Sequence, residues 1–248
     1  MKKALIVGGS SGIGLSMAIQ LAGRDAVERV YVVDKAPFPH QYITSKVEYH
    51  QFDLTDEDYS LFNQFSNIDT LVITAGFGRL ELFKDMDEKL ISTYFAVNTI
   101  PVLRIIKHFY DKLLSDKDFY CGVMVSIAGF LSSPFFSVYG ATKAALKIFI
   151  ESVNVELGKA GSSNRILNVS PGSIKGTNFN SVGGTDLSQL QELGSSILAE
   201  MEKKNDLYIP QYESIYKDVL RRYYEDFRAE GSHSYDYKLK SGRIQGNK

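Results

Sequence analysis

Short apolar, β-branched runs alternate along the chain with longer segments whose apolar residues recur at helical spacing. The runs lie at residues 4–7, 30–34, 47–54, 70–76, 122–126 and 166–170, and the longer segments include residues 15–22, 88–114 and 139–157. Strands that alternate with helices form right-handed βαβ units, which build a parallel sheet with helices on both faces. The pattern therefore predicts an α/β protein with a doubly wound, Rossmann-like parallel sheet in three α/β/α layers.

The alternation continues to about residue 207 without an internal repeat or a low-complexity linker, so residues 1–248 are interpreted as a single domain. Folds of this class often reach about 250 residues as one domain. Ligands bind such sheets beyond the carboxyl ends of the strands, near the point where strand order reverses. Residues that directly follow a strand are therefore the first candidates for a functional site.

Composition narrows the class of ligand. The chain has 28 basic and 29 acidic residues and a net charge of −1, which gives no electrostatic footprint for nucleic acid or an anionic membrane. Cys121 is the only cysteine and the four histidines are scattered, so neither a disulfide framework nor a metal site is expected. The first apolar run ends at Gly8, too short for a signal peptide, and no later run approaches the roughly 18 residues of a membrane span. A cytoplasmic protein with a small-molecule ligand is expected.

A glycine-rich turn, GGSSGIG, follows the first strand directly. Glycine at Gly8, Gly12 and Gly14 permits a tight turn and a close backbone approach, and the helix that follows points its N–H groups at a pyrophosphate. The spacing G-x-x-x-G-x-G is by itself only moderately specific, since such a turn can be a plain connection. Asp34, at the end of the second strand, is placed to hold the ribose hydroxyls of a dinucleotide. Asp53 is a weaker candidate on the adenine side, because Asp is also a common helix cap.

Tyr139 and Lys143 stand four residues apart in SVYGATKAALK, so a helix would place the phenol and the ammonium on one face. The pair alone is also compatible with packing, with the lysine stem lying along the ring. A cation within about 4 to 6 Å of a tyrosine favours the phenolate and lowers its pKa from the usual ~10. A tyrosinate near neutral pH could take a proton from an alcohol or return it to a carbonyl.

Six features in order and spacing carry a resemblance: GGSSGIG, Asp34, Asn98 in AVNT, Ser126 in VSIAG, YGATK at 139–143, and SPG at 170–172. Over residues 1–177 the chain resembles the short-chain dehydrogenase/reductase family, in its compact single-domain branch. The resemblance implies that Tyr139 is the general acid/base and that Lys143 lowers its pKa and binds the nicotinamide ribose. Ser126 would donate a hydrogen bond to the substrate oxygen. Asn98 would fix a bend in the long helix and hold a water that leads from Lys143 to solvent, or else be a mid-helix polar residue that faces a neighbour.

The resemblance also implies a set of cofactor-binding residues. They are Gly8, Ser10, Ser11, Gly12, Ile13, Gly14, Asp34, Asp53, Leu54, Ala75, Gly76, Tyr139, Lys143, Pro171, Gly172 and Ile174. NAD(H) is expected to be preferred, because Asp34 would repel a 2′-phosphate and Ser11 stands where NADP-using relatives often carry a basic residue. Lys35 could offset Asp34, so NADP(H) is left open.

Three departures from the family pattern affect the expectations. Thr74-Ala75-Gly76 replaces the usual Asn-Ala-Gly, and the threonine expected after Pro171-Gly172 falls one residue late, which leaves Gly176 or Thr177 as candidates. The usual C-terminal strand pattern is absent. The segments that normally contact substrate carry Phe77, Phe130, Phe135, Phe136 and Phe179, each of which is expected in the core rather than in a pocket.

The family pattern stops at residues 207–248, which are interpreted as a helical C-terminal extension within the domain. LYIPQ could form a last strand, and residues 211–231 place Ile215, Val219, Tyr223 and Phe227 on one helical face that must be buried. The hypothesis is that this helix docks near the mouth of the active site and that Lys240 or Arg243 meets an anionic substrate group. A solvated or oligomer-stabilising extension is the alternative.

The sequence thus favours an NAD(H)-dependent oxidoreductase that interconverts a secondary alcohol and a ketone. An NADPH-dependent carbonyl or 3-oxoacyl reductase and a non-catalytic dinucleotide-sensing regulator are alternatives. The resemblance further implies a homodimer or homotetramer, built by pairing residues 90–114 and 139–157 with the same helices of a partner. The small residues Ala141, Ala144 and Ala145 would permit that approach.

Overall fold

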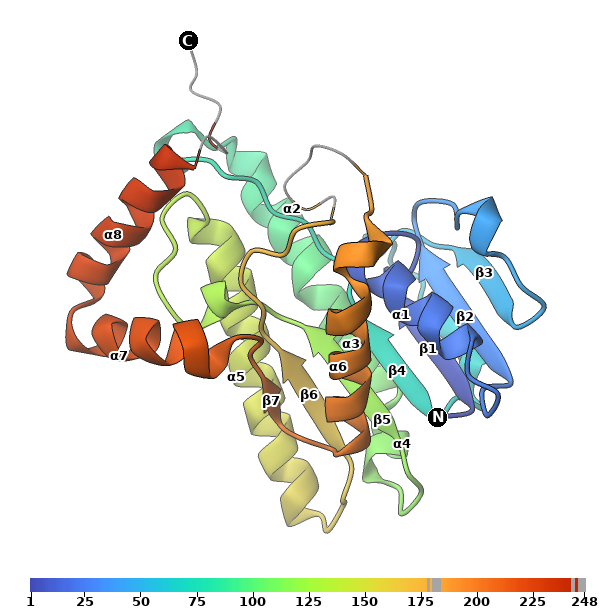
Figure 1. The fold of residues 1–248 in the computed structure, drawn as a ribbon. Helices are drawn as coiled ribbons and strands as arrows, with labels where there is room; N and C mark the ends of the chain where they lie inside the picture. Colours follow the sequence, from blue (N-terminus) through green and yellow to red (C-terminus); the bar gives the residue numbers. More distant parts are fainter. Residues whose placement is uncertain (178, 180–183, 242–243, 245–248) are drawn as a thin grey trace.

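The computed structural model describes residues 1–248 except 178, 180–183, 242–243 and 245–248. Seven strands form one sheet in the order β3-β2-β1-β4-β5-β6-β7, with every neighbouring pair parallel (Figure 1). The strands are β1 (Lys3–Val7), β2 (Arg29–Asp34), β3 (Val47–Gln51), β4 (Thr70–Ile73), β5 (Tyr120–Met124), β6 (Arg165–Val169) and β7 (Leu207–Tyr208). The strand order reverses between β1 and β4, and this confirms the doubly wound parallel sheet.

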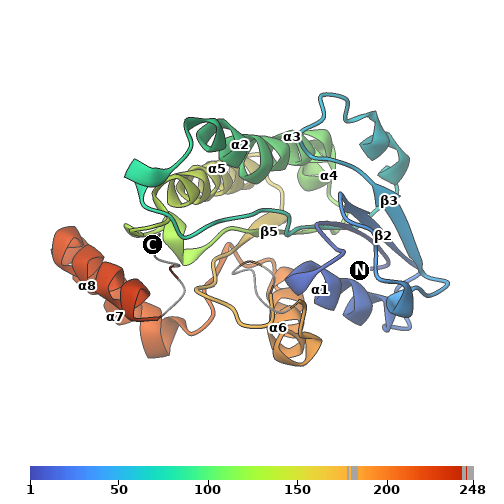
Figure 2. The ribbon, with the colours of Figure 1, turned by 90° about the horizontal axis from the view of Figure 1, so that it is seen from above.

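Helices cover both faces of the sheet, which gives the expected three layers. On one face lie α1 (Gly12–Ala22) and α6 (Gln191–Glu202), and on the other lie α2 (Glu88–Asn98), α3 (Ile100–His108), α4 (Tyr110–Leu114) and α5 (Ser137–Lys159) (Figure 2). Leu15, Leu21 and Leu198 belong to the core on the first face, and Ile105 and Leu146 to the core on the second. The strands between these cores are apolar on both sides, because helices bury both faces of a parallel sheet.

The long helix expected at residues 88–114 is divided into three. Thr99 leaves helical geometry at φ −121° between α2 and α3, and Pro101, in the first turn of α3, has no N–H to continue the ladder from α2. By length and composition alone, Glu88–His108 could cross a membrane, which differs from the expectation that no segment reaches that length. In this fold α3 is instead a core helix, because Val102, Ile105 and Ile106 are buried against the sheet.

The C-terminal extension begins with β7, as expected, and continues through a π-helical turn (Tyr212–Tyr216), α7 (Lys217–Glu225) and α8 (Phe227–Lys240). The single helix expected at residues 211–231 is wrong, because Asp226 ends α7 and caps α8 by accepting hydrogen bonds from the backbone of Arg228 and Ala229. Residues 232–240, beyond the expected helix, continue α8. Both helices lie outside the layers, beyond the β7 edge of the sheet (Figure 1).

Candidate active site

A large cavity of about 1460 Å³ lies at the carboxyl ends of the strands. Segments from both halves of the sheet contribute to its walls: the turn after β1, the ends of β2 and β4, the segment after β5, the start of α5, and the loop after β6. All predicted site residues except Ser10 and Asn98 line this cavity. Its volume exceeds the roughly 300–1,000 Å³ of a typical ligand pocket, so the cavity has room for a dinucleotide together with a second molecule.

The glycine-rich turn is shaped by contacts that leave no space for side chains. Gly8 has φ +90°, and a Cβ there would overlap the backbone of Ala75, while a Cβ on Gly14 would overlap the Gly8 carbonyl. Gly12 has φ +55° and begins α1, so the helix N-terminus faces the cavity. Backbone amides at a helix N-terminus are suited to phosphate groups. The residues present therefore fit the pyrophosphate of a dinucleotide.

Ser10 was expected to bind the cofactor, but it does not line the described cavity. Its backbone N–H donates to Asp34 Oδ2 at 2.9 Å, and its hydroxyl donates to the Ala36 carbonyl at 2.8 Å. The side chain is 5% exposed, because these bonds turn it towards the end of β2. Ser10 thus joins the glycine-rich turn to the β2 end.

The carboxylate of Asp34 is oriented by two backbone amides. Besides Ser10 N–H, the N–H of Ala36 donates to Oδ1 at 3.0 Å. The Lys35 ammonium lies 2.7 Å from Asp53 Oδ2, and the hydrogen bonds of Asp53 with Lys35 and Thr55 lower its pKa to about 2. Asp53 is therefore the ion-pair partner of Lys35 at this end of the cavity.

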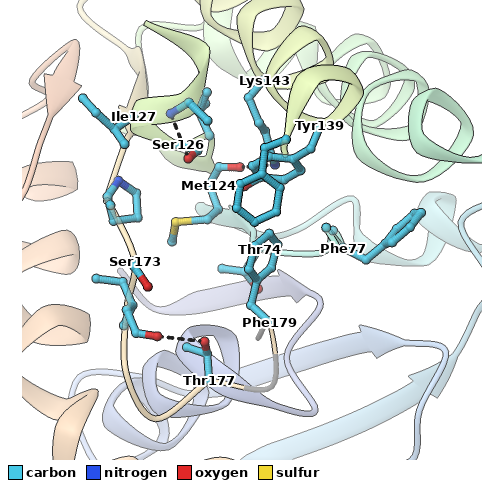
Figure 3. A pocket seen from close by; sticks show the side chains of 18 of the residues that line it. Thr74, Phe77, Met124, Ser126, Ile127, Tyr139, Lys143, Ser173, Thr177 and Phe179 are labelled. Atoms are coloured by element: carbon cyan, nitrogen blue, oxygen red, sulfur yellow. Dashed lines mark hydrogen bonds between the residues drawn. The ribbon is translucent and has the colours of Figure 1, made fainter. Parts of the chain in front are cut away.

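Tyr139, Ser126 and Lys143 come together because β5 leads directly to Ser126 and the first turns of α5 carry the other two (Figure 3). All three side chains are buried, with exposures of 7%, 9% and 3%. The Lys143 ammonium donates to the Met124 carbonyl at 2.9 Å and lies 5.7 Å from the centre of the Tyr139 ring. The structure thus gathers the predicted phenol, hydroxyl and ammonium at one place in the cavity wall.

The pKa of Tyr139 moves in the direction opposite to the expectation. Burial raises it to about 12, and a hydrogen bond with Ser126 only partly offsets this effect. Burial also lowers the pKa of Lys143 to about 8. Desolvation of the buried phenol is thus the main cause that sets the pKa of Tyr139, in place of the lowering that was expected from Lys143.

Asn98 lies behind the cavity wall rather than in it. Its amide group exchanges two hydrogen bonds of 2.9 Å with the backbone N–H and carbonyl of Phe77, and the side chain is fully buried. A further bond of 3.4 Å joins Asn98 Nδ2 to the Thr142 hydroxyl, which is in α5. Asn98 is the last residue of α2, so it connects the helix break, the segment after β4 and α5.

Three of the five phenylalanines expected in the core line the cavity, namely Phe77, Phe136 and Phe179. The Phe136 and Phe179 rings each lie 5.2 Å from the ring of Tyr139, and Phe179 faces Tyr139 in Figure 3. Phe135 is buried, as expected of a core residue, at 4% exposure. The expectation failed because an apolar residue after a strand can face either the core or a ligand cavity.

The loop after β6 fixes the positions of the remaining candidates. Pro171, Gly172, Ile174 and Thr177 line the cavity, and the Thr177 hydroxyl donates to the Ile174 carbonyl at 3.1 Å. Gly176, the other candidate for the displaced threonine, does not line the cavity in the described part of the chain.

The C-terminal extension forms one wall of the cavity. The sequence predicted that it lies near the active site, but not which of its residues line the cavity. The residues it contributes are Gln211, Ile215, Tyr216, Val219, Arg222, Glu230, His233, Ser234, Tyr237 and Lys238. Arg222 and Glu230 form a two-bonded ion pair, at 2.7 and 3.2 Å, between α7 and α8. The extension lies at the cavity, as expected, but the face expected to be buried is not, because Ile215 and Phe227 are 43% and 51% exposed. Lys240 is exposed and outside the described cavity lining, and Arg243 lies outside the described residues.

A family model for short chain dehydrogenases matches residues 2–186 of this chain. The chain belongs to the short-chain dehydrogenase family. An uncharacterised oxidoreductase of Saccharomyces cerevisiae is 29% identical over 191 residues, which cover 71% of this chain and 61% of the yeast protein. An uncharacterised oxidoreductase of Staphylococcus epidermidis is 25% identical over 208 residues, which cover 80% of this chain and 88% of that protein. The alignment therefore spans less than two thirds of the yeast relative.

Solved structures of short-chain dehydrogenases share the fold. One from Streptomyces avermitilis superposes with a TM-score of 0.74 at 20% identity and covers 97% of this chain and 100% of that chain. Another, from Burkholderia cenocepacia in complex with NADP, gives a TM-score of 0.76 at 19% identity, with 94% of this chain and 99% of that chain covered. Family membership makes the chain an NAD(P)-dependent oxidoreductase.

Proposed function

We propose that this short-chain dehydrogenase interconverts a secondary alcohol and a ketone with NAD(H) as its preferred cofactor. The observation that carries the proposal is the convergence of Tyr139, Ser126 and Lys143 on one wall of a cavity that also contains the glycine-rich turn. A bound nicotinamide would supply or accept the hydride. The turn at Gly8, Gly12 and Gly14 would hold the pyrophosphate, and Asp34 the adenosine ribose.

In this proposal the protein residues handle the proton and the developing charge. Ser126, which lies beside Tyr139 in the cavity wall, donates to the substrate oxygen where negative charge develops. The Tyr139 hydroxyl gives its proton to that oxygen during reduction and takes it back during oxidation. A phenol pKa of about 12 keeps the proton on Tyr139 at neutral pH, so that the phenol can act as the proton donor in the reductive direction.

The NAD(H) preference is supported by the charges at the end of β2. The Asp34 carboxylate would lie next to the 2′-phosphate of NADP(H) and repel it. Lys35 could have offset this repulsion, but its ammonium is engaged by Asp53 at 2.7 Å.

Dissociation constants measured by nucleotide fluorescence test the cofactor preference. NADH should bind at least about tenfold more tightly than NADPH, which corresponds to about 1.4 kcal/mol. Asp34→Asn should reduce this ratio, because it removes the negative charge and keeps one acceptor oxygen. Lys159→Met, on an exposed lysine at the end of α5 that does not line the described cavity, is the control and should leave the binding of both cofactors unchanged. Tighter binding of NADPH by the unaltered chain would refute the NAD(H) preference.

A panel of secondary alcohols and ketones, followed at the nicotinamide absorbance band, tests the reaction. Once a substrate is found, Tyr139→Phe should lower turnover by at least ~10²-fold while the chain still binds NADH, because it removes the proton carrier and keeps the ring. Tyr224→Phe, on an exposed tyrosine of α7 with 74% exposure, is the matched control. Turnover that survives Tyr139→Phe would refute the mechanism, and NADH binding without turnover of any panel member would favour a regulator.

A further inference from the structure

The loop that leads from Ser126 into α5 contains a strained residue. Phe135 has φ +66° although it is neither Gly nor Asn, and its side chain is 4% exposed. A bulky residue in the left-handed region is unfavourable and persists only where the surrounding structure holds it there. Phe135 lies four residues before Tyr139, so whatever holds this loop also acts on the approach to the catalytic phenol.

One face of α8 holds the loop. The Lys238 ammonium donates to the Ser133 hydroxyl and to the Pro134 carbonyl, both at 2.7 Å. The Tyr235 ring lies 4.6 Å from the Phe135 ring. Gly231 packs so closely on the loop that a Cβ there would lie 3.1 Å from the Ser132 hydroxyl oxygen. Residues 231, 235 and 238 follow the helical repeat, so these contacts come from a single side of α8.

The opposite side of the loop is fixed by the main body of the fold. The backbone N–H of Glu81, in the segment after β4, donates to the Phe135 carbonyl at 2.9 Å. The next residue, Phe136, has its ring 5.2 Å from the Tyr139 ring and 5.4 Å from the Lys238 ammonium. A chain of direct contacts therefore runs from α8 through the loop to Tyr139.

We propose that α8 is the element that positions the active site, and that Lys238 is its principal positioning residue. Two charge-assisted hydrogen bonds from a side chain that is only 9% exposed hold Ser133 and Pro134, and Tyr235 secures the strained Phe135. Phe136, which also lines the cavity, then supports the Tyr139 ring at 5.2 Å. The catalytic part of this inference rests on the proposed function, but the ordering of the loop does not.

Hydrogen–deuterium exchange tests the ordering without any substrate. The amide of Phe136, which donates to the Ser133 carbonyl at 2.9 Å, reports on the loop. Lys238→Met removes both donors and keeps the length of the side chain, so exchange in peptides that cover residues 131–136 should become at least about tenfold faster. Lys240→Met changes an exposed lysine of the same helix and should leave this exchange unchanged.

Turnover tests the catalytic consequence. Lys238→Met should lower kcat about ten- to a hundredfold, since displacement of a reacting group by about 1 Å can cost a hundredfold, while the dissociation constant for NADH stays the same. Ser133→Ala should lower kcat in the unaltered chain and have a smaller effect in the Lys238→Met background. If Lys238→Met fails to fold, Tyr235→Leu tests the same loop through the other contact.

The outcomes separate this inference from the proposed function. Unchanged exchange in both Lys238→Met and Tyr235→Leu overturns the positioning role, whatever the turnover. Faster exchange with unchanged kcat also overturns it, because the loop would then be ordered without consequence for Tyr139. Faster exchange in a protein that turns over no alcohol or ketone supports the ordering and refutes the proposed reaction.

Discussion

The fully buried side chain of Asn98 and the backbone of the partly buried Phe77 exchange two hydrogen bonds of 2.9 Å. The Asn98 side chain bonds to the N–H and the carbonyl of Phe77, which follows β4, in the way that a neighbouring strand would. The pair holds this segment at the cavity wall, where Phe77 stacks on Tyr94 with ring centres 4.5 Å apart. Asn98 thus shapes the site from behind, without facing the cavity itself.

Asn98→Ala should therefore reduce the free energy of unfolding by about 1 to 3 kcal/mol, because it leaves a partly buried N–H and a partly buried carbonyl of Phe77 without a partner. Urea denaturation followed by circular dichroism measures this change. Asn63→Ala, on an exposed asparagine, is the control and should stay within about 0.5 kcal/mol. A loss no larger than that of the control would contradict the structural role of Asn98.

The sequence predicted the sheet and the grouping of Ser126, Tyr139 and Lys143 because both depend on local patterns. β-Branched runs specify the strands, and parallel strands carry Ser126 and the start of α5 to the same edge. The break at Thr99 could have been inferred from Pro101, and the start of α8 from Asp226, since both residues have known positional preferences in helices.

The contacts of α8 could not have been predicted from periodicity. Its sequence, FRAEGSHSYDYKLK, has no continuous apolar face. The helix is held instead by close packing at Gly231, a ring contact of Tyr235 and hydrogen bonds from Lys238. The raised pKa of Tyr139 was missed for a similar reason. Desolvation depends on the three-dimensional surroundings of the phenol, whereas the four-residue spacing to Lys143 is visible in the sequence.

Lys143 should make stability depend on pH in a defined way. Burial lowers its pKa from 10.5 to about 8, so between these values the unfolded chain binds more protons than the folded chain. The free energy of unfolding contributed by this group therefore rises with pH across that window, and the full cost of burying the charge is present below pH 8.

Lys143→Met removes the charge and should be about 2 to 3 kcal/mol more stable than the unaltered chain at pH 7, with the gap closing as the pH approaches 10.5. Parallel urea denaturation of the two chains at pH 7, 8.5 and 10 gives the difference. Lys147→Met, which removes a lysine that pairs with Glu151 on the same helix, should show no such pH dependence. A stability difference that is constant over the range would refute the charge burial.

The expected oligomer interface has an apolar stripe on α5. Ile148 and Val155 are seven residues apart on one helical face and are 58% and 64% exposed, and Ile100 at the start of α3 is 50% exposed. We propose that these residues pair with the same helices of a second copy. Ile148→Asp should then lower the solution mass towards that of one chain in light scattering at micromolar concentration. Ile43→Asp, at a comparably exposed isoleucine elsewhere, should not. A single-chain mass for the unaltered protein would end this proposal.

Gly172, in the predicted cofactor loop, and Tyr216, in the extension, are in direct contact. A methyl group on Gly172 would overlap the Tyr216 hydroxyl, and the three nearest atoms to that methyl group all belong to Tyr216. Gly172→Ala should cost about 1 to 3 kcal/mol of stability through overpacking. Because Tyr216 is the source of the overlap, the cost should fall to about zero when Tyr216→Leu removes the end of the ring.

A double-mutant cycle in urea measures this coupling, with Gly23→Ala as the control. Gly23 has helical geometry, and a Cβ there would make only ordinary contacts of 3.5 Å or more, so alanine should be neutral or slightly stabilising. An equal cost of Gly172→Ala in both Tyr216 backgrounds would mean that the cost does not come from the contact with Tyr216. A coupling of the expected size would instead confirm that the extension and the cofactor loop are in direct contact in the folded protein through Tyr216 and Gly172.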